Sequence, residues 1–321
     1  MLPVTGAMAS RVEVIVNCNA QRLGAASPLR RALVSAFVQV GATVHTTTSL
    51  GELGETAREI AKRGTDVVVL VGGDGSHMCG VSALAQAHVG QALPRIALFP
   101  AGTVGTVARS TGAYAARKLP AVYARALKGG SARTLAQPTL RVQDDRGGDH
   151  VAFMFGAGLV ARFFEVYNAS PRRGRVRAAQ ITARLFFGSI CGSPFARHVL
   201  ARERGWLSVD GLAHSAPAWS LVLASVVPDV GLHVRVAYRA REAPPRFHVV
   251  ASGQSPGALG RQLPRVLAGM PLRGEPTVDA LALGVEFVFG GDDGAYVLDG
   301  DVLRANRIRV SPGPALTLLT P

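Results

Sequence analysis

Lysine is nearly missing from this chain. Of its 321 residues, 35 are lysine or arginine and 21 are aspartate or glutamate, yet the lysines are only Lys62, Lys118 and Lys128. The formal net charge of +14 favours attraction to a polyanion such as a nucleotide or an anionic membrane surface, although an arginine-rich genomic composition explains the excess equally well. No recognised module or basic-aromatic interleaving accompanies the charge, so nucleic acid is not an expected partner.

Long apolar runs and closely spaced cysteines are also missing. The longest apolar stretches, such as residues 219–227, are far shorter than a membrane span. The N-terminal residues 1–7 show no basic stretch followed by an apolar core, so we expect no signal peptide. Cys18, Cys79 and Cys191 have no zinc-site spacing and are expected to be reduced core residues. These absences favour a cytoplasmic protein.

Strand and helix patterns alternate in the first third of the chain. Such alternation predicts right-handed crossovers and a doubly wound parallel sheet, in which ligands bind beyond the carboxyl ends of the strands. The predicted strands are residues 12–16, 43–47, 67–71 and 95–99, and the predicted helices are residues 28–40, 52–63, 81–88 and 118–128.

The pattern changes after Leu135 to short strand-like runs divided by Gly, Pro and Asp turns. We therefore expect an α/β domain over residues 1–135 and an antiparallel β-sandwich-like domain over residues 136–321, with a C-terminal tail able to pack back on the first domain. The predicted strands include residues 139–142, 151–155, 221–227, 232–238 and 247–251, and the arginine-rich residues 171–187 are predicted to be helical.

Two glycine-rich segments each follow a predicted buried strand. They are Gly72-Gly-Asp-Gly-Ser76 and Pro100-Ala-Gly-Thr-Val-Gly-Thr-Val-Ala-Arg109. Backbone N–H groups of both loops, with the hydroxyls of Ser76 and Thr103, could hold one polyphosphate, and Asp74 would organise a magnesium ion or its water. Two unrelated tight turns remain an alternative.

Other phosphate sites fit less well. A Walker A loop requires a Gly-Lys dipeptide, and the chain contains none. Gly156-Ala-Gly-Leu-Val-Ala161 matches the glycine fingerprint of a dinucleotide site, but arginines occupy the region where an acidic residue is expected.

Together, the two glycine-rich segments resemble the diacylglycerol kinase catalytic-domain family of lipid kinases, which includes bacterial diacylglycerol kinases and sphingosine kinases. The family pattern is Gly-Gly-Asp-Gly-Thr, then a strand, then Pro-x-Gly-Thr-x-Asn-Asp-x-Ala-Arg. The segment from Val14 to Arg22 is similar to the family's opening strand and turn, and residues 296–303 are similar to its Asp-Gly-Glu motif.

The resemblance implies that ATP and Mg²⁺ bind the first domain and that a lipid binds the second, with reaction in the cleft between them. Asp301 takes the place of the family's glutamate as general base, and Asp299 orients it or the metal. Val230 replaces the family's aspartate at a structural magnesium site, so this metal is lost unless Asp229 substitutes as its ligand. The implied nucleotide-binding residues are Asn17, Arg22, Thr48, Gly72, Gly73, Asp74, Gly75, Ser76, Gly102 and Thr103.

Three departures from the family pattern bear on activity. Gly105 and Thr106 replace an Asn-Asp pair, Val230 replaces an aspartate, and Asp301 is one methylene shorter than glutamate. The leading hypothesis is a lipid kinase, acting on a diacylglycerol or sphingoid base and drawn peripherally to anionic membranes by the arginines at 172, 173, 175 and 177. An NAD kinase-like enzyme and a weak or inactive nucleotide- or lipid-binding relative remain alternatives, and both monomer and homodimer remain open.

Overall fold

The computed structural model describes residues 10–20, 23–24, 27–102, 105, 108–109, 111–112, 120–129, 131–170, 174–231 and 234–320. The chain divides into two compact units: unit 1 comprises residues 1–137 and 316–321, and unit 2 comprises residues 138–315. Unit 1 has a mainly parallel sheet with helices, and unit 2 has antiparallel sheets. The fold class predicted from the sequence is confirmed.

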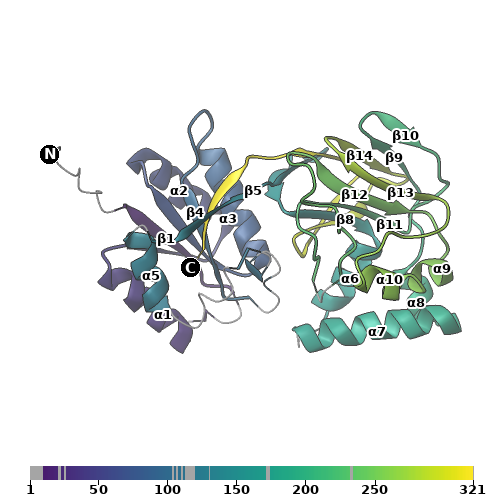
Figure 1. Cartoon of the computed structure of the whole chain (residues 1–321), viewed down its shortest axis with the longest axis horizontal. Helices are drawn as coiled ribbons and strands as arrows, with labels where there is room; N and C mark the ends of the chain where they lie inside the picture. Colours follow the sequence, from purple (N-terminus) through teal and green to yellow (C-terminus); the bar gives the residue numbers. More distant parts are fainter. Residues whose placement is uncertain are drawn as a thin grey trace. The chain divides into compact units, whose positions relative to one another are not determined.

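Unit 1 is built on a six-stranded sheet with the strand order β2-β1-β3-β4-β18-β5 (Figure 1). Strands β1 to β4 and β18 run parallel to one another, and only β5, at the edge beside β18, runs antiparallel. The bounds are β1 Val12–Asn17, β2 Thr43–Thr47, β3 Val67–Gly72, β4 Arg95–Pro100, β5 Arg133–Gln137 and β18 Leu316–Thr320.

Helices cover both faces of this sheet, which explains why β3 is apolar throughout. Val67, Val69 and Val71 pack in one core cluster with residues of α1 and α5. On the other face, Leu70 meets α3 so closely that a Cβ on Gly80 would lie 2.8 Å from its Cδ2 atom. The bounds are α1 Pro28–Gln39, α2 Leu50–Arg63, α3 Asp74–Ala87 and α5 Pro120–Lys128.

The helix starts in unit 1 follow local sequence signals. Ser27 caps α1 by accepting a hydrogen bond from the N–H of Arg30, and Pro28 occupies the first turn, where no intrahelical N–H donor is needed. Ser49 caps α2 by accepting from the N–H of Glu52. Helix α3 is different, because it begins at Asp74 and not near Val81 as the sequence predicted.

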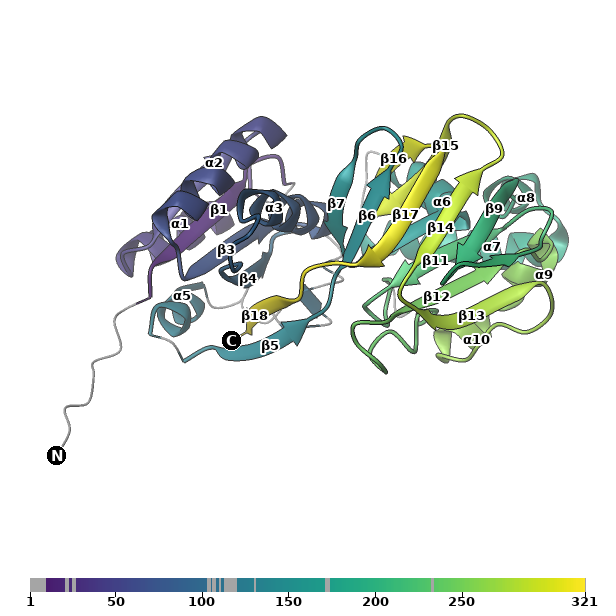
Figure 2. The same ribbon diagram turned by 90° about the horizontal axis from the view of Figure 1, so that it is seen from above.

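Unit 2 contains two antiparallel sheets with the orders β10-β9-β14-β17-β6-β7 and β13-β12-β11-β8-β15-β16, and Figure 2 labels many of these strands. The bounds are β6 Leu140–Asp144, β7 Asp149–Ala152, β8 Met154–Gly158, β9 Gly205–Val209, β10 Leu212–His214, β11 Leu221–Ser225, β12 Phe247–Ser252, β13 Thr277–Ala282, β14 Val285–Phe289, β15 Gly294–Leu298, β16 Asp301–Ala305 and β17 Arg307–Pro312.

Helices of unit 2 pack on the sheet that contains β8, β11 and β12 (Figure 1). Met154, Leu223 and Val250 from these strands share a core cluster with Ile181 and Leu185 of α7. The bounds are α6 Leu159–Asn168, α7 Arg175–Cys191, α8 Pro194–Val199, α9 Pro256–Gly260 and α10 Leu263–Leu267. Within the described part of the chain, no helix combines the length and apolarity needed to cross a bilayer.

Two sequence interpretations in unit 2 change. The strand predicted over residues 232–238 is wrong for its described part, residues 234–238, which form coil and turns. The dinucleotide fingerprint at Gly156 does join a strand to a helix, but β8 pairs antiparallel with both β11 and β15. It therefore lacks the parallel βαβ setting that a dinucleotide site uses.

Candidate functional site

The first glycine-rich segment forms an abrupt junction between β3 and α3. Strand β3 ends at Gly72, Gly73 is the N-cap, and Asp74 and Gly75 are already the first helical residues. As a glycine, the N-cap residue provides no side-chain cap for this helix. Backbone N–H groups in the first turn of a helix lack intrahelical acceptors, and the helix dipole makes this end attractive to anions. The junction therefore has the properties of a phosphate-binding site.

The second glycine-rich segment lies directly against this junction. The backbone N–H groups of Ala101 and Gly102 both approach the carbonyl oxygen of Gly72, at 2.7 and 3.1 Å. A Cβ added to Gly102 would lie 2.6 Å from the Cα of Gly73, and one added to Gly72 would lie 2.3 Å from the Cβ of Ser76. The carboxyl ends of β3 and β4 can meet this closely only because glycine has no side chain.

Asn17 connects the end of β1 to the same junction. Its side-chain amide donates a 2.7 Å hydrogen bond to the hydroxyl of Ser76, in the first turn of α3. Its carbonyl oxygen accepts from the N–H of Asn19 at 2.9 Å, which fixes the orientation of the amide group. The structure thus brings together Asn17, Gly72, Gly73, Ser76 and Gly102 at the carboxyl ends of three neighbouring strands.

Thr48 has a hydrogen-bonding role that the sequence prediction did not include. Its hydroxyl donates to the carboxylate of Glu52 at 3.0 Å, and its backbone N–H donates to the same carboxylate at 2.7 Å. These hydrogen bonds lower the pKa of Glu52. Asn19 adds a 2.6 Å bond from its amide to the carbonyl oxygen of Thr48. Nucleotide contact by Thr48 stays a prediction.

His77 is a buried residue of this site that sequence reasoning missed. Its Nε2 atom lies 3.4 Å from the carbonyl oxygen of Phe99, and its Nδ1 atom has no hydrogen-bond partner among the described residues. Burial lowers the pKa of the imidazole, and the nearby carboxylate of Asp74 offsets this effect in part. We infer a neutral ring that donates from Nε2 to Phe99 and links α3 to β4.

The sequence did contain a signal for the hydrogen-bonded position of Glu52. Ser49 and Glu52 have the spacing of a capping box, which predicts a helix start with a fixed glutamate. A single histidine after a glycine turn carries no comparable signal. The contact of His77 is with Phe99 of β4, which lies about twenty residues further along the chain and is brought against α3 by the fold.

Asp299 and Asp301 have the spacing of two residues on the same face of a strand, but they do not lie on one strand. Asp299 and Gly300 form the two-residue turn between β15 and β16, with φ angles of 49° and 103°. Two successive positive φ values are typical of a type I′ hairpin turn. The chain reverses between the two acids, so the alternation of side chains along a strand does not apply to them.

The two acids consequently differ in environment. Asp299 is buried, and its Oδ2 atom accepts a 2.9 Å hydrogen bond from the N–H of Phe153. Asp301 is exposed and opens β16, opposite Leu298. The turn also approaches α6, since a Cβ on Gly300 would lie 3.3 Å from the ring of Phe164. The catalytic roles predicted for both acids stay predictions.

The metal ligands predicted from the sequence are Asp74 and Asp229. Asp74 lies in the first turn of α3, while the Oδ1 atom of Asp229 accepts a 2.8 Å hydrogen bond from the N–H of Gly231 in its own turn. Among the described residues, no three His, Cys, Asp or Glu side chains are grouped as a metal site. Magnesium bound through nucleotide phosphates needs only one or two protein carboxylates.

Several predicted site residues lie outside the described residues. These are Arg22 and Thr103 of the nucleotide site, Thr106 of the second loop, and Arg172, Arg173 and the side chain of Arg175 in the basic cluster. Arg177 lies in the first turn of α7.

Comparison with known proteins identifies the family that the first part of the chain matches. Residues 11–135 match the family model of the diacylglycerol kinase catalytic domain, which confirms the resemblance inferred from the glycine-rich segments. The match spans β1 to β4 and therefore includes the whole glycine junction. None of the curated proteins matches the chain.

Solved structures share the fold of the whole chain. A diacylglycerol kinase from Bacillus anthracis str. Sterne superposes with a TM-score of 0.63 at 13% identity, covering 98% of both chains. A candidate diacylglycerol kinase from the same organism superposes with a TM-score of 0.68 at 15% identity, covering 100% of this chain and 98% of the other. At these identities the likeness shows the fold.

Proposed function

We propose that this protein is an ATP-dependent kinase that phosphorylates a hydroxyl group of a diacylglycerol-like or sphingoid lipid. The observation that carries the proposal is the glycine junction, where the uncapped start of α3 meets the backbone of Gly102 inside the region that matches a diacylglycerol kinase catalytic domain. Phosphoryl transfer asks the protein mainly for positioning and for stabilisation of charge, and this site suits both tasks.

The residues at the junction fit a nucleotide with magnesium. Gly102 can pack against the backbone of Gly73 only without a Cβ atom, and the N-cap residue Gly73 offers no side chain to the first-turn N–H groups of α3. Bound ATP and Mg²⁺ supply the transferable phosphoryl group and neutralise part of its charge. Asp74 would hold the metal or its water, and Ser76, oriented by Asn17, would donate to a phosphate oxygen.

On the acceptor side, Asp301 takes the proton from the lipid hydroxyl. Its exposure suits a general base, which must reach a hydroxyl of the substrate. Asp299 is bonded to the backbone at Phe153 and is therefore better suited to fixing the hairpin turn than to proton transfer. Asp301 thus carries the chemistry, while Asp299, two residues earlier, holds the turn.

A phosphoryl-transfer assay tests this proposal. The parent protein, Asp74→Asn and Asp66→Asn are incubated with radiolabelled ATP, Mg²⁺ and a total lipid extract, with NAD as a parallel acceptor. Asp66 is a matched control because it is exposed and precedes β3, whereas Asp74 follows the strand. We expect label in lipid for the parent and for Asp66→Asn, and almost none for Asp74→Asn.

The other outcomes separate the alternatives. Label in NAD and not in lipid would identify an NAD kinase-like enzyme. Nucleotide binding without transfer to either acceptor would identify an inactive relative that only binds its ligands. Full activity of Asp74→Asn would contradict the role given to this carboxylate.

The proposal includes peripheral binding to anionic membranes. The net charge of +14 and the arginines at 172, 173, 175 and 177 support it, together with exposed apolar side chains on α7, where Val176 is 74% and Phe187 is 63% exposed. Basic residues beside exposed apolar ones are typical of helices that lie in a membrane surface. Replacing the four arginines by glutamine should weaken vesicle binding by about 1 kcal/mol per charge. Binding that is independent of salt would contradict this mechanism.

A further inference from the structure

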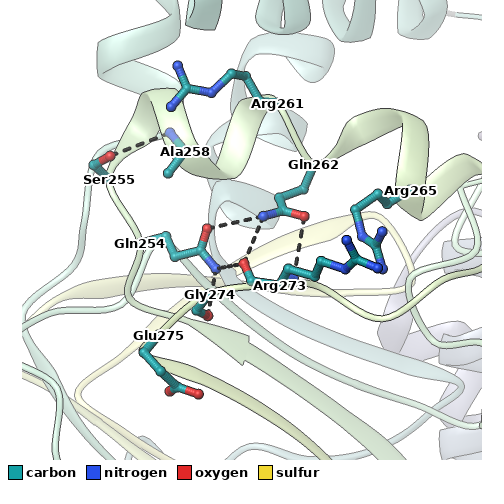
Figure 3. Close-up of a pocket in the computed structure, with 9 residues that line it drawn as sticks. All are labelled: Gln254, Ser255, Ala258, Arg261, Gln262, Arg265, Arg273, Gly274 and Glu275. Atoms are coloured by element: carbon teal, nitrogen blue, oxygen red, sulfur yellow. Dashed lines mark hydrogen bonds between the residues drawn. The ribbon is translucent and has the colours of Figure 1, made fainter.

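Unit 2 contains a pocket whose lining includes three arginines. The pocket has a volume of about 530 Å³ and is formed by α9, α10 and the loop that leads into β13 (Figure 3). Arg261, Arg265 and Arg273 line it together with Gln254, Gln262 and Glu275. None of these residues belongs to the glycine junction or to the hairpin at Asp299.

The three arginines bring an uncompensated positive charge to this pocket. Among the described residues, none of them forms an ion pair with a carboxylate, although arginines elsewhere in unit 2 commonly do. Arg265 uses its Nε atom to donate to the carbonyl oxygen of Pro271 at 3.1 Å. Glu275 is the one carboxylate in the lining, and it accepts from the backbone N–H of Thr277 at 3.1 Å. Three cationic groups and one anion therefore contribute to the lining.

Two glutamines hold the arginine-bearing loop in place. The side-chain amide of Gln254, which is 6% exposed, donates to the carbonyl oxygens of Arg273 at 2.7 Å and Gly274 at 2.9 Å. Gln262 of the neighbouring segment donates to the same oxygen of Arg273 at 2.8 Å and accepts from its N–H at 3.4 Å. Both backbone polar groups of Arg273 are thus bonded to side chains, as Figure 3 shows. The backbone of Arg273 is therefore fixed before any ligand arrives.

We propose that this pocket is a binding site for a phosphate group. A guanidinium group can donate two parallel hydrogen bonds to two oxygens of one phosphate. Hydrogen bonds between such charged groups are stronger than those between neutral groups. The buried amide of Gln254 and the three arginines of the lining suit a charged head group and do not suit an acyl chain. The phosphate is carried either by a lipid head group or by a small soluble phosphate ester, and the site does not depend on the kinase activity proposed above.

Binding measurements on matched variants test this site. The pocket variant carries Arg261→Gln, Arg265→Gln and Arg273→Gln. The control variant carries Arg141→Gln, Arg304→Gln and Arg307→Gln, which removes the same charge from exposed arginines of the same unit that are in ion pairs. Calorimetric titration with glycerol phosphate provides one arm, and sedimentation with phosphatidylcholine vesicles with and without phosphatidic acid provides the other.

We expect the pocket variant to lose at least about tenfold in affinity in one arm, since one charge-assisted hydrogen bond is worth about that factor. The control variant should bind like the parent. A loss with glycerol phosphate alone identifies a soluble ester, and a loss with the vesicles alone identifies a lipid head group. Equal affinities of parent and pocket variant in both arms would overturn the proposal, as would an equal loss in the control.

A single substitution keeps the test decisive if the triple variant does not fold. Arg261→Glu changes an exposed side chain, so the fold should be retained, as circular dichroism can verify. It reverses one charge in the pocket and should also weaken binding. Nucleotide binding at the glycine junction, measured in the same samples, should equal that of the parent, so failure of this site is distinguishable from failure of the kinase proposal.

Discussion

Gly73 and Gly102 approach each other asymmetrically. A Cβ on Gly102 would lie 2.6 Å from the Cα of Gly73, whereas a Cβ on Gly73 would lie 3.5 Å from the Cα of Gly102, which is an ordinary contact. Gly102 is therefore required by the packing of the two loops. The packing does not require glycine at position 73, so a requirement there comes from a ligand that approaches the start of α3. Substitution of each glycine separates the two requirements.

Gly102→Ala should destabilise the protein, and Gly73→Ala should weaken nucleotide binding. In Gly102→Ala, the new methyl group meets the backbone of Gly73, which should lower the free energy of unfolding by about 1–3 kcal/mol. Alanine at position 73 meets no such obstacle in the protein, but its Cβ lies beside the uncapped amides of α3. Thermal unfolding and ATP-binding titrations of both variants provide the measurements. A Gly73→Ala protein with the parent's ATP affinity would show that the nucleotide does not approach this backbone.

The hydrogen bond between Asn17 and Ser76 should appear as a coupling energy. The bond joins the end of β1 to the first turn of α3 over 2.7 Å. A double-mutant cycle with Asn17→Ala and Ser76→Ala removes this bond. We expect a coupling of about 0.5–1.5 kcal/mol in the free energy of unfolding, obtained from urea titrations of the four proteins. Strictly additive effects of the two substitutions would argue against this bond.

His77 should make stability depend on pH. Because burial lowers the pKa of its imidazole, the unfolded chain takes up a proton near the ordinary pKa of histidine while the folded protein does not. The contribution of the neutral ring is therefore present above that pKa and is lost progressively as the pH falls below it, by at most about 1.4 kcal/mol per pH unit.

The pH dependence can be isolated with two variants. The difference in unfolding free energy between pH 7 and pH 5 should be smaller in His77→Gln than in the parent, as measured by urea unfolding at each pH. It should be at least as large in Asp74→Asn as in the parent, because the carboxylate that favours the protonated ring is gone. Identical pH profiles of the parent and His77→Gln would contradict the buried neutral state.

Asp301→Asn should lower turnover by about 10²- to 10⁴-fold, the usual cost of removing a general base, while ATP affinity stays close to that of the parent. Asp301→Glu restores the residue found in the family pattern and should be active. Asp299→Asn is the matched comparison, since asparagine tolerates positive φ and keeps an acceptor for the N–H of Phe153. Lipid phosphorylation by Asp301→Asn at the parent's rate would place the base elsewhere, with Asp299 the next residue to test.

The sequence by itself determined the parallel part of the fold. Apolar runs such as residues 67–71 predicted the strands because such a run can be buried on both faces only inside a covered sheet. Capping residues and glycine turns also act locally, so the positions of α1 and of the glycine-rich segments could be predicted from neighbouring residues alone. These are features in which hydrogen bonding and burial depend on residues close in the chain.

Only the tertiary structure decided which distant residues meet. Three contacts of the site join separate strands and helices. They are the contact of Gly73 with Gly102, the hydrogen bond between Asn17 and Ser76, and the contact of buried His77 with the carbonyl oxygen of Phe99. The turn at Asp299 shows the limit of local patterns, since Asp-Gly-Asp is compatible with a strand, and pairing of β15 with β16 and the bond to Phe153 select the reversal. The arginine pocket likewise exists because Gln254 and Gln262 bind the backbone of Arg273. Such contacts depend on long-range packing, and a one-dimensional pattern does not contain them.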